Sequence, residues 1–248
     1  MTRVLLLAGS SEAAELARRL HEEDGVVVVA SFAGRVRDLG ALPCATRVGG
    51  FGGVGGLMAE LGEGAYDLLV DATHPFAAQM SRNAWRAAQE LGVPLLRLDR
   101  PPWQPGDGDD WHEVADLDEA AAWLAEGGVR VAFLATGRHD IAPFAGLTGT
   151  RLVLRTIDPP EWEVPPNVEI VLARGPFSLD DEIALLRAHD VEALVTRNSG
   201  GAAAAPKLTA ARELGMPVVL VSRPPSDPTE TVSTVDAALS WVRARRGA

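Results

Sequence analysis

The chain has 248 residues, of which 47% are hydrophobic and 23% charged, a composition typical of one large globular domain or two small ones. The net charge of −11 argues against nucleic acid as a partner, because phosphate backbones bind basic surfaces. No apolar run reaches the roughly 18 residues of a membrane span, no segment resembles a signal peptide, and the single cysteine, Cys44, excludes an internal disulfide and a cysteine-based metal cluster. We therefore expect a cytoplasmic protein with no membrane partner and no metal site.

The start of the chain predicts the phosphate-binding corner of a Rossmann-like fold. Residues 3–8 are an apolar run typical of a buried parallel strand, and residues 13–21 have the pattern of an amphipathic helix. The free N–H groups and the dipole at such a helix start attract a pyrophosphate. A full G-x-G-x-x-G motif is absent, so the prediction depends on the turn between the two elements, which consists of Gly9, Ser10, Ser11 and Glu12.

The second strand, residues 26–30, ends in groups that favour NADP over NAD. An NAD enzyme usually places Asp or Glu about 20 residues after its glycine turn, where the carboxylate binds the ribose hydroxyls. This chain offers Ser31, Gly34 and Arg35 there. A hydroxyl and a guanidinium bind a 2′-phosphate, which a carboxylate would repel. The alternative for Arg35 is a solvated loop arginine.

Two further segments of the first half indicate a ligand site. Residues 49–53 are so rich in glycine that Gly50, Phe51 and Gly52 predict either a close approach of backbone to ligand or a flexible loop. A helix over residues 56–61 leads to a buried strand at residues 68–70. At the carboxyl end of that strand, where open α/β sheets bind ligands, stand Asp71, Ala72, Thr73, His74 and Pro75. The alternative is that Asp71 and Thr73 cap the next helix, with Pro75 in its first turn.

A helix over residues 77–91 and a strand over residues 95–98 complete the first lobe, and Arg100 follows that strand. Residues 104–110 are polar, acidic and rich in turn formers, which indicates a boundary. We therefore divide the chain into an N-terminal Rossmann-like lobe, residues 1–106, and a C-terminal α/β lobe, residues 107–248.

The second lobe repeats the alternation of strands and helices. We expect helices over residues 117–126, 178–189, 202–214 and 235–245, strands over residues 129–135, 151–157, 168–173, 194–196 and 218–221, and a short helix or turn at residues 141–144. Several of these strands again deliver small, polar and cationic residues at their carboxyl ends. The residues are Thr136, Gly137 and Arg138 after one strand, Arg174 after another, and Arg197, Asn198, Ser199 and Gly200 after a third.

The two halves share a pattern. Residues 90–94 (ELGVP) recur as residues 213–217 (ELGMP), and residues 100–102 (RPP) recur as residues 223–225, both at an offset of 123. Any two helix–Gly–Pro–strand units look alike to some degree, but the match without gaps favours an internal duplication. The sequence therefore predicts an α/β fold of two similar Rossmann-like lobes, with mainly parallel sheets and a ligand cleft between them.

Arginines gather at the predicted strand ends although the protein is acidic overall. Together with Lys207, the only lysine of the chain, they suggest an anionic ligand with several carboxylates or phosphates. An ordinary surface position is the alternative for Lys207. The chain lacks the Tyr-x-x-x-Lys pair of short-chain dehydrogenases, a P-loop, an H-E-x-x-H motif and a G-x-S-x-G elbow.

Taken together, these motifs resemble the precorrin-6A reductase family of cobalamin biosynthesis over nearly the whole chain. The most specific segments are residues 71–77 (DATHPFA) and residues 198–201 (NSGG). The likeness also covers residues 9–12, 31–35, 49–53, 100–103, 136–138, 174–177 and 223–224, with Lys207. Two departures keep the chemistry: Ser10 stands where the family often has threonine, and Arg197 where lysine is common.

The resemblance implies NADPH-dependent reduction of one double bond in precorrin-6A, a ring-contracted tetrapyrrole with many carboxylates, to give precorrin-6B. NADPH would bind the strand ends of the first lobe and supply the hydride. The candidate proton donors are His74, Lys207 and a bound water, and His74 and Lys207 are the candidate catalytic residues. The candidate substrate-binding residues are Arg100, Thr136, Gly137, Arg138, Arg174, Arg197, Asn198, Ser199, Gly200 and Lys207.

Some alternatives stay open at this point. The substrate could be metal-free or hold cobalt, and the product could pass directly to neighbouring enzymes of the pathway. Two other classes of function also fit a pair of Rossmann-like lobes, since fold alone does not determine function. They are a non-catalytic NADP-binding sensor and a transferase with a nucleotide-linked donor.

Overall fold

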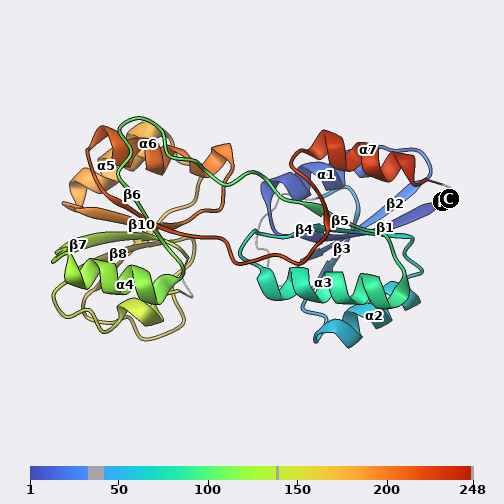
Figure 1. Ribbon diagram of the computed structural model, residues 1–248, viewed down its shortest axis with the longest axis horizontal. Coiled ribbons are helices and arrows are strands. Elements are labelled where there is room, and N and C mark those ends of the chain that lie inside the picture. Colours follow the sequence, from blue (N-terminus) through green and yellow to red (C-terminus); the bar gives the residue numbers. More distant parts are fainter. Residues whose placement is uncertain (33–41, 138–139, 247–248) are drawn as a thin grey trace. The chain divides into compact units, whose positions relative to one another are not determined.

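The computed structural model describes residues 1–32, 42–137 and 140–246, which form two compact units (Figure 1). Unit 1 contains Met1–Pro101 and Pro224–Ala248, and unit 2 contains Pro102–Arg223. Each unit holds a six-stranded sheet in which every paired strand runs parallel to its neighbour, so the expected α/β fold with two parallel sheets is confirmed. Within these residues, no helix combines the length and the apolar character that crossing a membrane requires.

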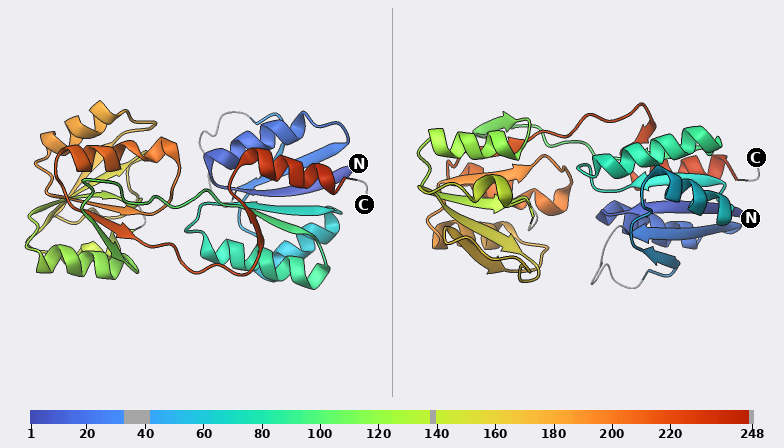
Figure 2. Two further views of the ribbon diagram at one scale, coloured as in Figure 1. Left: turned by 45° about the horizontal axis from the view of Figure 1, so that its top comes forward. Right: turned by 90° about the horizontal axis from the view of Figure 1, so that it is seen from below.

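Unit 1 is a sheet covered by helices on both faces (Figures 1 and 2). Its elements are β1 (Thr2–Ala8), α1 (Ser11–His21), β2 (Val26–Phe32), β3 (Ala45–Val48), α2 (Val54–Glu63), β4 (Leu68–Ala72), α3 (Ala78–Leu91), β5 (Leu95–Leu98), β12 (Glu230–Val232) and α7 (Val235–Ala244). Along β1, Val4 and Leu6 pack with α1 and α7, whereas Leu5 and Leu7 pack with α2 and α3, because successive side chains of a strand point to opposite faces. The near-continuous apolar runs of the sequence are therefore strands that are buried on both faces.

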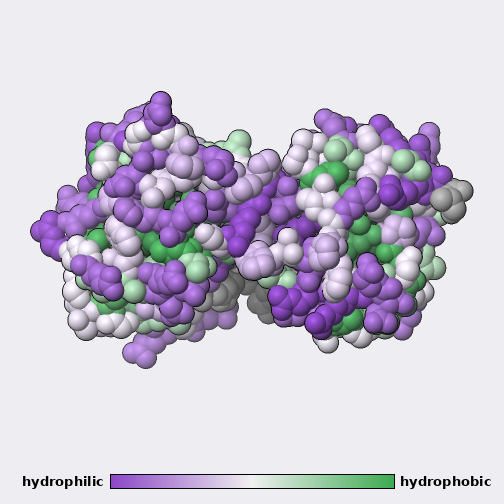
Figure 3. Space-filling view, in the orientation of Figure 1, coloured by the Kyte–Doolittle hydropathy of each residue, from purple (hydrophilic) through white to green (hydrophobic). Residues whose placement is uncertain are grey.

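Unit 2 has the same layered build. Its elements are β6 (Trp111–Val114), α4 (Leu117–Glu126), β7 (Val131–Ala135), the 3₁₀ turn η1 (Ala142–Phe144), β8 (Arg151–Thr156), β9 (Val168–Leu172), α5 (Leu179–Ala188), β10 (Ala193–Arg197), the 3₁₀ turn η2 (Ala202–Ala204), α6 (Pro206–Glu213) and β11 (Val218–Val221). Phe133 and Leu194 pack with α5 and α6 on one face of the sheet, and Figure 1 shows α4 on the other. In the face shown in Figure 3, the surface is mainly hydrophilic and apolar residues form small separate patches.

The two sheets have the same strand order, but each contains one edge strand that comes from the other half of the chain. Unit 1 has the order β12-β5-β4-β1-β2-β3, and unit 2 has the order β6-β11-β10-β7-β8-β9. Five strands correspond one to one in chain order, which supports the internal duplication. The sixth strand does not: β6 follows β5 in the chain but pairs with β11, and β12 follows β11 but pairs with β5. Each unit therefore completes its sheet with the strand that follows the other unit's five.

The structure differs from the sequence predictions at three strands and one helix. The missed strands β3, β6 and β12 are all edge strands with few buried residues, so they carry no apolar run to reveal them. The helix expected over residues 202–214 is split into η2 and α6, because Pro206 has no N–H to continue a helix and instead occupies the first position of α6.

The C-terminal segment belongs to unit 1 and not to the second lobe in which the sequence analysis placed it. Thr231 of β12 pairs with Arg97 of β5, and α7 packs on α1 through Ala238, Leu239 and Val242. The reason is the open edge of β5, whose backbone groups need a partner strand. Near the first connection, unit 2 begins at Pro102, five positions before residue 107, where the second lobe was expected to begin.

Candidate active site

In unit 1, the ends of β1 and β4 are joined into one polar corner. Ser10 caps α1 by accepting a hydrogen bond from the Ala13 amide at 3.1 Å, and its hydroxyl donates to the Ala72 carbonyl at 3.0 Å. A side chain at Gly9 would place its Cβ 3.3 Å from the amide nitrogen of His74, so the two strand ends lie close together. β1 has β2 on one side and β4 on the other, and α/β sheets bind ligands at such a switch point.

Asp71 shapes the turn after β4. Its buried carboxylate, only 3% exposed, accepts hydrogen bonds from the Thr73 amide at 3.1 Å and the Thr73 hydroxyl at 2.7 Å. The alternative that Asp71 and Thr73 cap the next helix is wrong, because α3 begins at Ala78 and has no side-chain cap. Pro75 likewise lies in the turn before α3 and not in its first turn. The turn thus presents Thr73 and His74 beside Gly9.

His74 is only partly buried and stands at this corner. Its Nδ1 accepts a hydrogen bond from the Phe76 amide at 3.3 Å, and the rings of His74 and Phe76 are tilted by 40° with their centres 5.9 Å apart. That contact directs the Nδ1 side of the ring towards its own turn.

Glu12 and Arg100 form an ion pair at the same corner. Arg100 donates to the Glu12 carboxylate at 2.9 Å, and the two side chains are 15% and 26% exposed. Burial opposes ionisation of Glu12, but its own backbone amide and the nearby charge of Arg100 lower the pKa of this carboxyl overall. The structure therefore pairs Arg100, predicted to be a substrate residue, with the predicted cofactor residue Glu12, which also accepts a hydrogen bond from Ser11.

The glycine-rich loop is held by an arginine that the sequence analysis did not identify. Arg47, on β3, donates to the carbonyls of Gly49 at 2.6 Å and Gly50 at 3.3 Å, and its guanidinium lies 3.9 Å from the centre of the Phe51 ring. Gly52 adopts a φ of 76°, which favours glycine. The loop is therefore an ordered structure built around Arg47. The signal available in the sequence was weak, because Arg47 lies outside any apolar run.

In unit 2, hydrogen bonds with a tryptophan hold the Asn198–Gly201 segment in place. The side-chain amide of Asn198 accepts a hydrogen bond from the Trp103 amide at 2.7 Å and donates to the Trp103 carbonyl at 3.1 Å. The indole Nε1 of Trp103 donates to the Gly201 carbonyl at 3.0 Å. From the other end of the unit, Arg223 donates to the carbonyls of Asn198 at 2.8 Å and Ser199 at 3.1 Å. The loop after β10 is therefore fixed by residues at both ends of unit 2.

Lys207 is buried in the second position of α6, being only 7% exposed, so it is not an ordinary surface lysine. Its ammonium donates to the Ala204 carbonyl at 3.1 Å and lies 5.0 Å from the centre of the Trp103 ring. A buried ammonium beside an aromatic face is strongly constrained in position. Trp103 therefore connects Lys207 with the Asn198–Gly201 segment.

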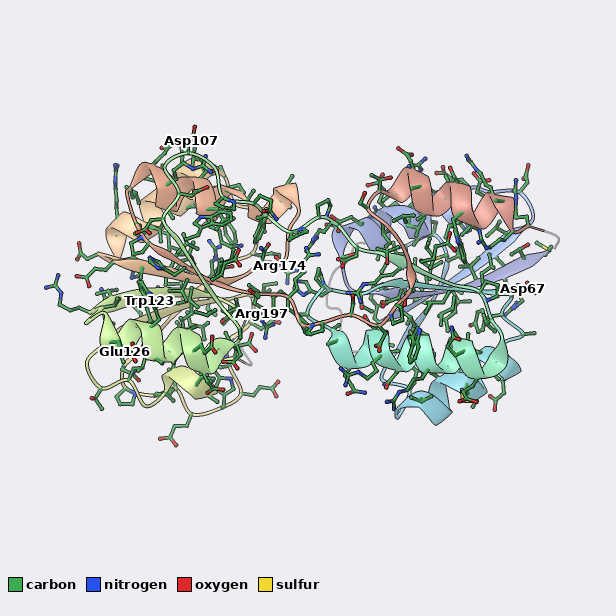
Figure 4. All side chains as sticks on the ribbon, viewed as in Figure 1. Asp67, Asp107, Trp123, Glu126, Arg174 and Arg197 are labelled. Atoms are coloured by element: carbon green, nitrogen blue, oxygen red, sulfur yellow. The ribbon has the colours of Figure 1, made fainter. Side chains whose placement is uncertain are left out.

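The remaining predicted residues of unit 2 follow neighbouring strands. Thr136 after β7 is 8% exposed, and its hydroxyl has no hydrogen-bond partner among the described residues. Gly137 has a φ of 115°. Arg197 at the end of β10 donates to Asp140 at 2.7 Å. Figure 4 labels Arg174 and Arg197 at the same end of the sheet, where β9 and β10 finish. These groups form a second polar edge within unit 2, to which Ser199 and Gly200 also belong.

The structure thus sorts the predicted residues into two sets. The set in unit 1 contains the cofactor candidates Gly9, Ser10, Ser11, Glu12, Ser31, Gly50, Phe51, Gly52, Asp71, Ala72, Thr73, His74 and Pro75, together with Arg100. The set in unit 2 contains the substrate candidates Thr136, Gly137, Arg174, Arg197, Asn198, Ser199, Gly200 and Lys207. Gly34, Arg35 and Arg138 lie outside the described residues. Across the described ranges, no group of His, Cys, Asp and Glu side chains could hold a metal ion.

Comparisons with known proteins give one consistent answer. The chain is 49% identical over 243 residues to a precorrin-6A reductase of Rhodococcus erythropolis, covering 98% of both chains. It is 45% identical over 245 residues to a precorrin-6A reductase of Mycobacterium tuberculosis, again with 98% of each chain covered. A solved structure titled CobK precorrin-6A reductase superposes with a TM-score of 0.92 at 42% identity, covering 100% of this chain and 98% of the other. The family described as precorrin-6x reductase CbiJ/CobK matches residues 3–243, and this chain is a member of that family.

Proposed function

We propose that this protein reduces one double bond of precorrin-6A with NADPH to give precorrin-6B in cobalamin biosynthesis. The observation that carries the proposal is the likeness to precorrin-6A reductases, at 42–49% identity over nearly the full length of both chains. The two polar edges at the carboxyl ends of the sheets support it, because hydride transfer needs a nucleotide site and a separate site for the acceptor.

The residues of unit 1 fit a dinucleotide. A Cβ at Gly9 would lie in tight contact with the His74 amide, at 3.3 Å. Ser10 precedes α1, whose start is favourable for a phosphate group. The ion pair keeps the Glu12 carboxylate neutralised by Arg100, so a bound phosphate would not face an uncompensated negative charge. In this proposal, the turn from Asp71 to Pro75 and the glycine-rich loop bind the rest of the cofactor.

The residues of unit 2 fit a polycarboxylate. Arg174, Arg197 and Lys207 are cationic groups at or near the strand ends of one sheet, and guanidinium groups bind carboxylates through paired hydrogen bonds. Thr136 contributes a buried hydroxyl that lacks a partner among the described residues. We assign these groups to binding and orienting the macrocycle, a positioning role that contributes strongly to such reactions.

NADPH, when bound, supplies the hydride. The carbon next to the reduced position needs a proton. The candidate donors are His74, in the turn after β4 next to Phe76, and Lys207, next to Trp103. The ammonium of Lys207 would also stabilise negative charge that develops on the macrocycle. The contact of His74 with Phe76 and the contact of Lys207 with Trp103 restrict the orientations of the two side chains.

The comparisons favour a metal-free substrate. Relatives named precorrin-6A reductase are 42–49% identical to the chain, whereas relatives named cobalt-precorrin-6A reductase, from Methanothermobacter thermautotrophicus and Priestia megaterium, are 32% and 31% identical. We therefore expect turnover of precorrin-6A to exceed turnover of its cobalt complex.

An anaerobic assay tests the proposal. Purified protein, NADPH and precorrin-6A are mixed, and the absorbance of NADPH and the spectrum of the pigment are followed together. Coupled loss of NADPH and a shift of the pigment spectrum is the expected result, with a slower rate for the cobalt complex. NADPH binding without turnover of either pigment would instead support a sensor, and binding of a nucleotide sugar without NADPH binding would support a transferase.

A further inference from the structure

Arg47 stands next to the end of β2, where dinucleotide folds read the adenosine ribose. β2 and β3 are parallel neighbours with Ser31 paired to Arg47, so both side chains lie on the same face of the sheet. The Arg47 guanidinium reaches the Ser31 hydroxyl at 3.5 Å. Residues 31–37 contain no aspartate or glutamate, and the first carboxylate after β2 in the sequence is Asp38. An arginine of the neighbouring strand β3 therefore lies beside the end of β2.

The guanidinium of Arg47 is locked in place but keeps donor capacity. Nε donates to Glu60 at 3.0 Å, Nη1 donates to Gly49 and Ser31, and Nη2 donates to the Gly50 carbonyl. An arginine has five N–H groups, so these four bonds leave one N–H on Nη2 without a partner among the described residues. The side chain is 28% exposed, so this edge can reach a ligand from solvent.

The surroundings of Arg47 fix its plane. The Phe51 ring, 3.9 Å away, covers one face of the guanidinium, and Glu60 is itself held by the Tyr66 hydroxyl at 3.3 Å. Ser31 is only 3% exposed, so its hydroxyl supports the arginine and offers little open surface of its own. A guanidinium held in this way loses little conformational freedom when it binds a phosphate.

We propose that Arg47 recognises the 2′-phosphate of NADPH, with Ser31, Phe51 and Glu60 as positioning residues. The inference rests on the proposed function, since it places the adenosine end of NADPH at β2 and β3. The sequence analysis expected this role of Arg35, which lies outside the described residues. Arg47 belongs to β3 and contacts the glycine-rich loop directly. Glu60 reduces the net positive charge at this point, so it limits the strength of phosphate binding.

The test compares nucleotides that differ only in the phosphate. Dissociation constants are measured by calorimetry for NADPH and NADH, and for 2′,5′-ADP and 5′-ADP, with the wild type, Arg47→Met and Arg47→Lys. We expect Arg47→Met to raise the dissociation constants of NADPH and 2′,5′-ADP by about 10- to 100-fold, because a charge-assisted contact is lost. The dissociation constants of NADH and 5′-ADP should rise by about threefold or less. Arg47→Lys keeps the positive charge but lacks the planar guanidinium, so its affinity for NADPH should lie between those of the wild type and Arg47→Met.

Two further variants sharpen the result. Glu60→Gln keeps a hydrogen-bond acceptor but removes the charge, so it should tighten NADPH binding about two- to threefold and leave NADH unchanged. Arg82→Met removes an exposed arginine of α3, 49% exposed, and should change no nucleotide affinity. The ratio of NADPH to NADH affinity is taken within one preparation, so partial loss of folded protein cancels.

The outcomes separate the inference from the function on which it rests. If the wild type does not prefer NADPH to NADH, the proposed cofactor is wrong. The inference is wrong if the wild type prefers NADPH and Arg47→Met keeps that preference. It is also wrong if Arg47→Met weakens the binding of NADPH and NADH equally, because Arg47 then only shapes the loop.

Discussion

Replacing Glu182 by glutamine should destabilise unit 2 strongly. Glu182, on α5, accepts two hydrogen bonds from Arg155 of β8, at 3.0 and 2.8 Å, and the two side chains are 4% and 12% exposed. Arg155 is further enclosed by the rings of Phe177 at 3.7 Å and Phe133 at 5.1 Å. Glu182→Gln keeps the shape and one acceptor oxygen but leaves the buried guanidinium without a counter-charge.

The expected magnitude follows from this burial. Breaking a buried ion pair from one side costs about 3–5 kcal/mol of unfolding free energy, whereas an exposed pair contributes about 0–1 kcal/mol. The matched control is Arg151 on the same strand, whose partner Glu169 is 44% exposed. We therefore expect Glu182→Gln to cost about 3 kcal/mol and to lower Tm by roughly 6–12 °C, and Glu169→Gln to cost under about 1 kcal/mol.

Urea unfolding followed by circular dichroism measures both changes. A double variant, Arg155→Met with Glu182→Leu, removes both charges and should recover much of the loss, because the cost arises from an unpaired buried charge. Equal small losses for Glu182→Gln and Glu169→Gln would refute the reasoning, and so would a double variant that is less stable than Glu182→Gln alone.

Three further changes test other parts of the molecule. Gly56→Ala would place a Cβ 1.7 Å from the Phe51 carbonyl oxygen, so it should weaken NADPH binding about tenfold or more by displacing the loop, as calorimetry would show. The lowered pKa of Glu12 means that its pairing with Arg100 stabilises the fold above about pH 4.5 and ceases to do so as the pH falls through the lowered pKa, so the stability difference between wild type and Glu12→Gln should shrink in urea unfolding at pH 3 relative to pH 7. Lys207→Ala should lower kcat/KM for the macrocycle at least about tenfold while the dissociation constant for NADPH stays unchanged, and an effect on NADPH alone would contradict its assignment.

The sequence was sufficient for the buried part of the fold. Strands such as β4 and β10 are apolar runs because helices cover both of their faces, and that pattern is visible without coordinates. The edge strands were not predictable in the same way, because β3 and β12 have mostly exposed side chains and are defined by backbone pairing alone. The assignment of the C-terminal segment failed for a related reason, since a strand's partner across the chain leaves no local signal.

The site shows the same division. Residues in tight turns after buried strands, such as Thr73 and Asn198, could be selected as candidates because polar residues stand out where an apolar run ends, and the structure places both at strand ends. Two residues that hold candidate loops in place, Trp103 and Arg47, were missed as site residues. Trp103 acts through its backbone and indole on a loop 95 positions later, and Arg47 acts through stacking on Phe51. Such roles depend on distances between segments, which spacing within one segment cannot reveal.

The exchanged edge strands have a consequence for the order of events during synthesis. Unit 2 is one continuous stretch, and all of its strands are synthesised before β12, whereas unit 1 needs residues from both sides of unit 2. Until residues 224–248 emerge, β5 is an open edge and α1 lacks α7, so the nascent N-terminal half exposes the surface that promotes pairing with other chains. A chain truncated after β11 would therefore contain a complete second unit attached to an aggregation-prone first one, so the integrity of unit 1 depends on residues 224–248.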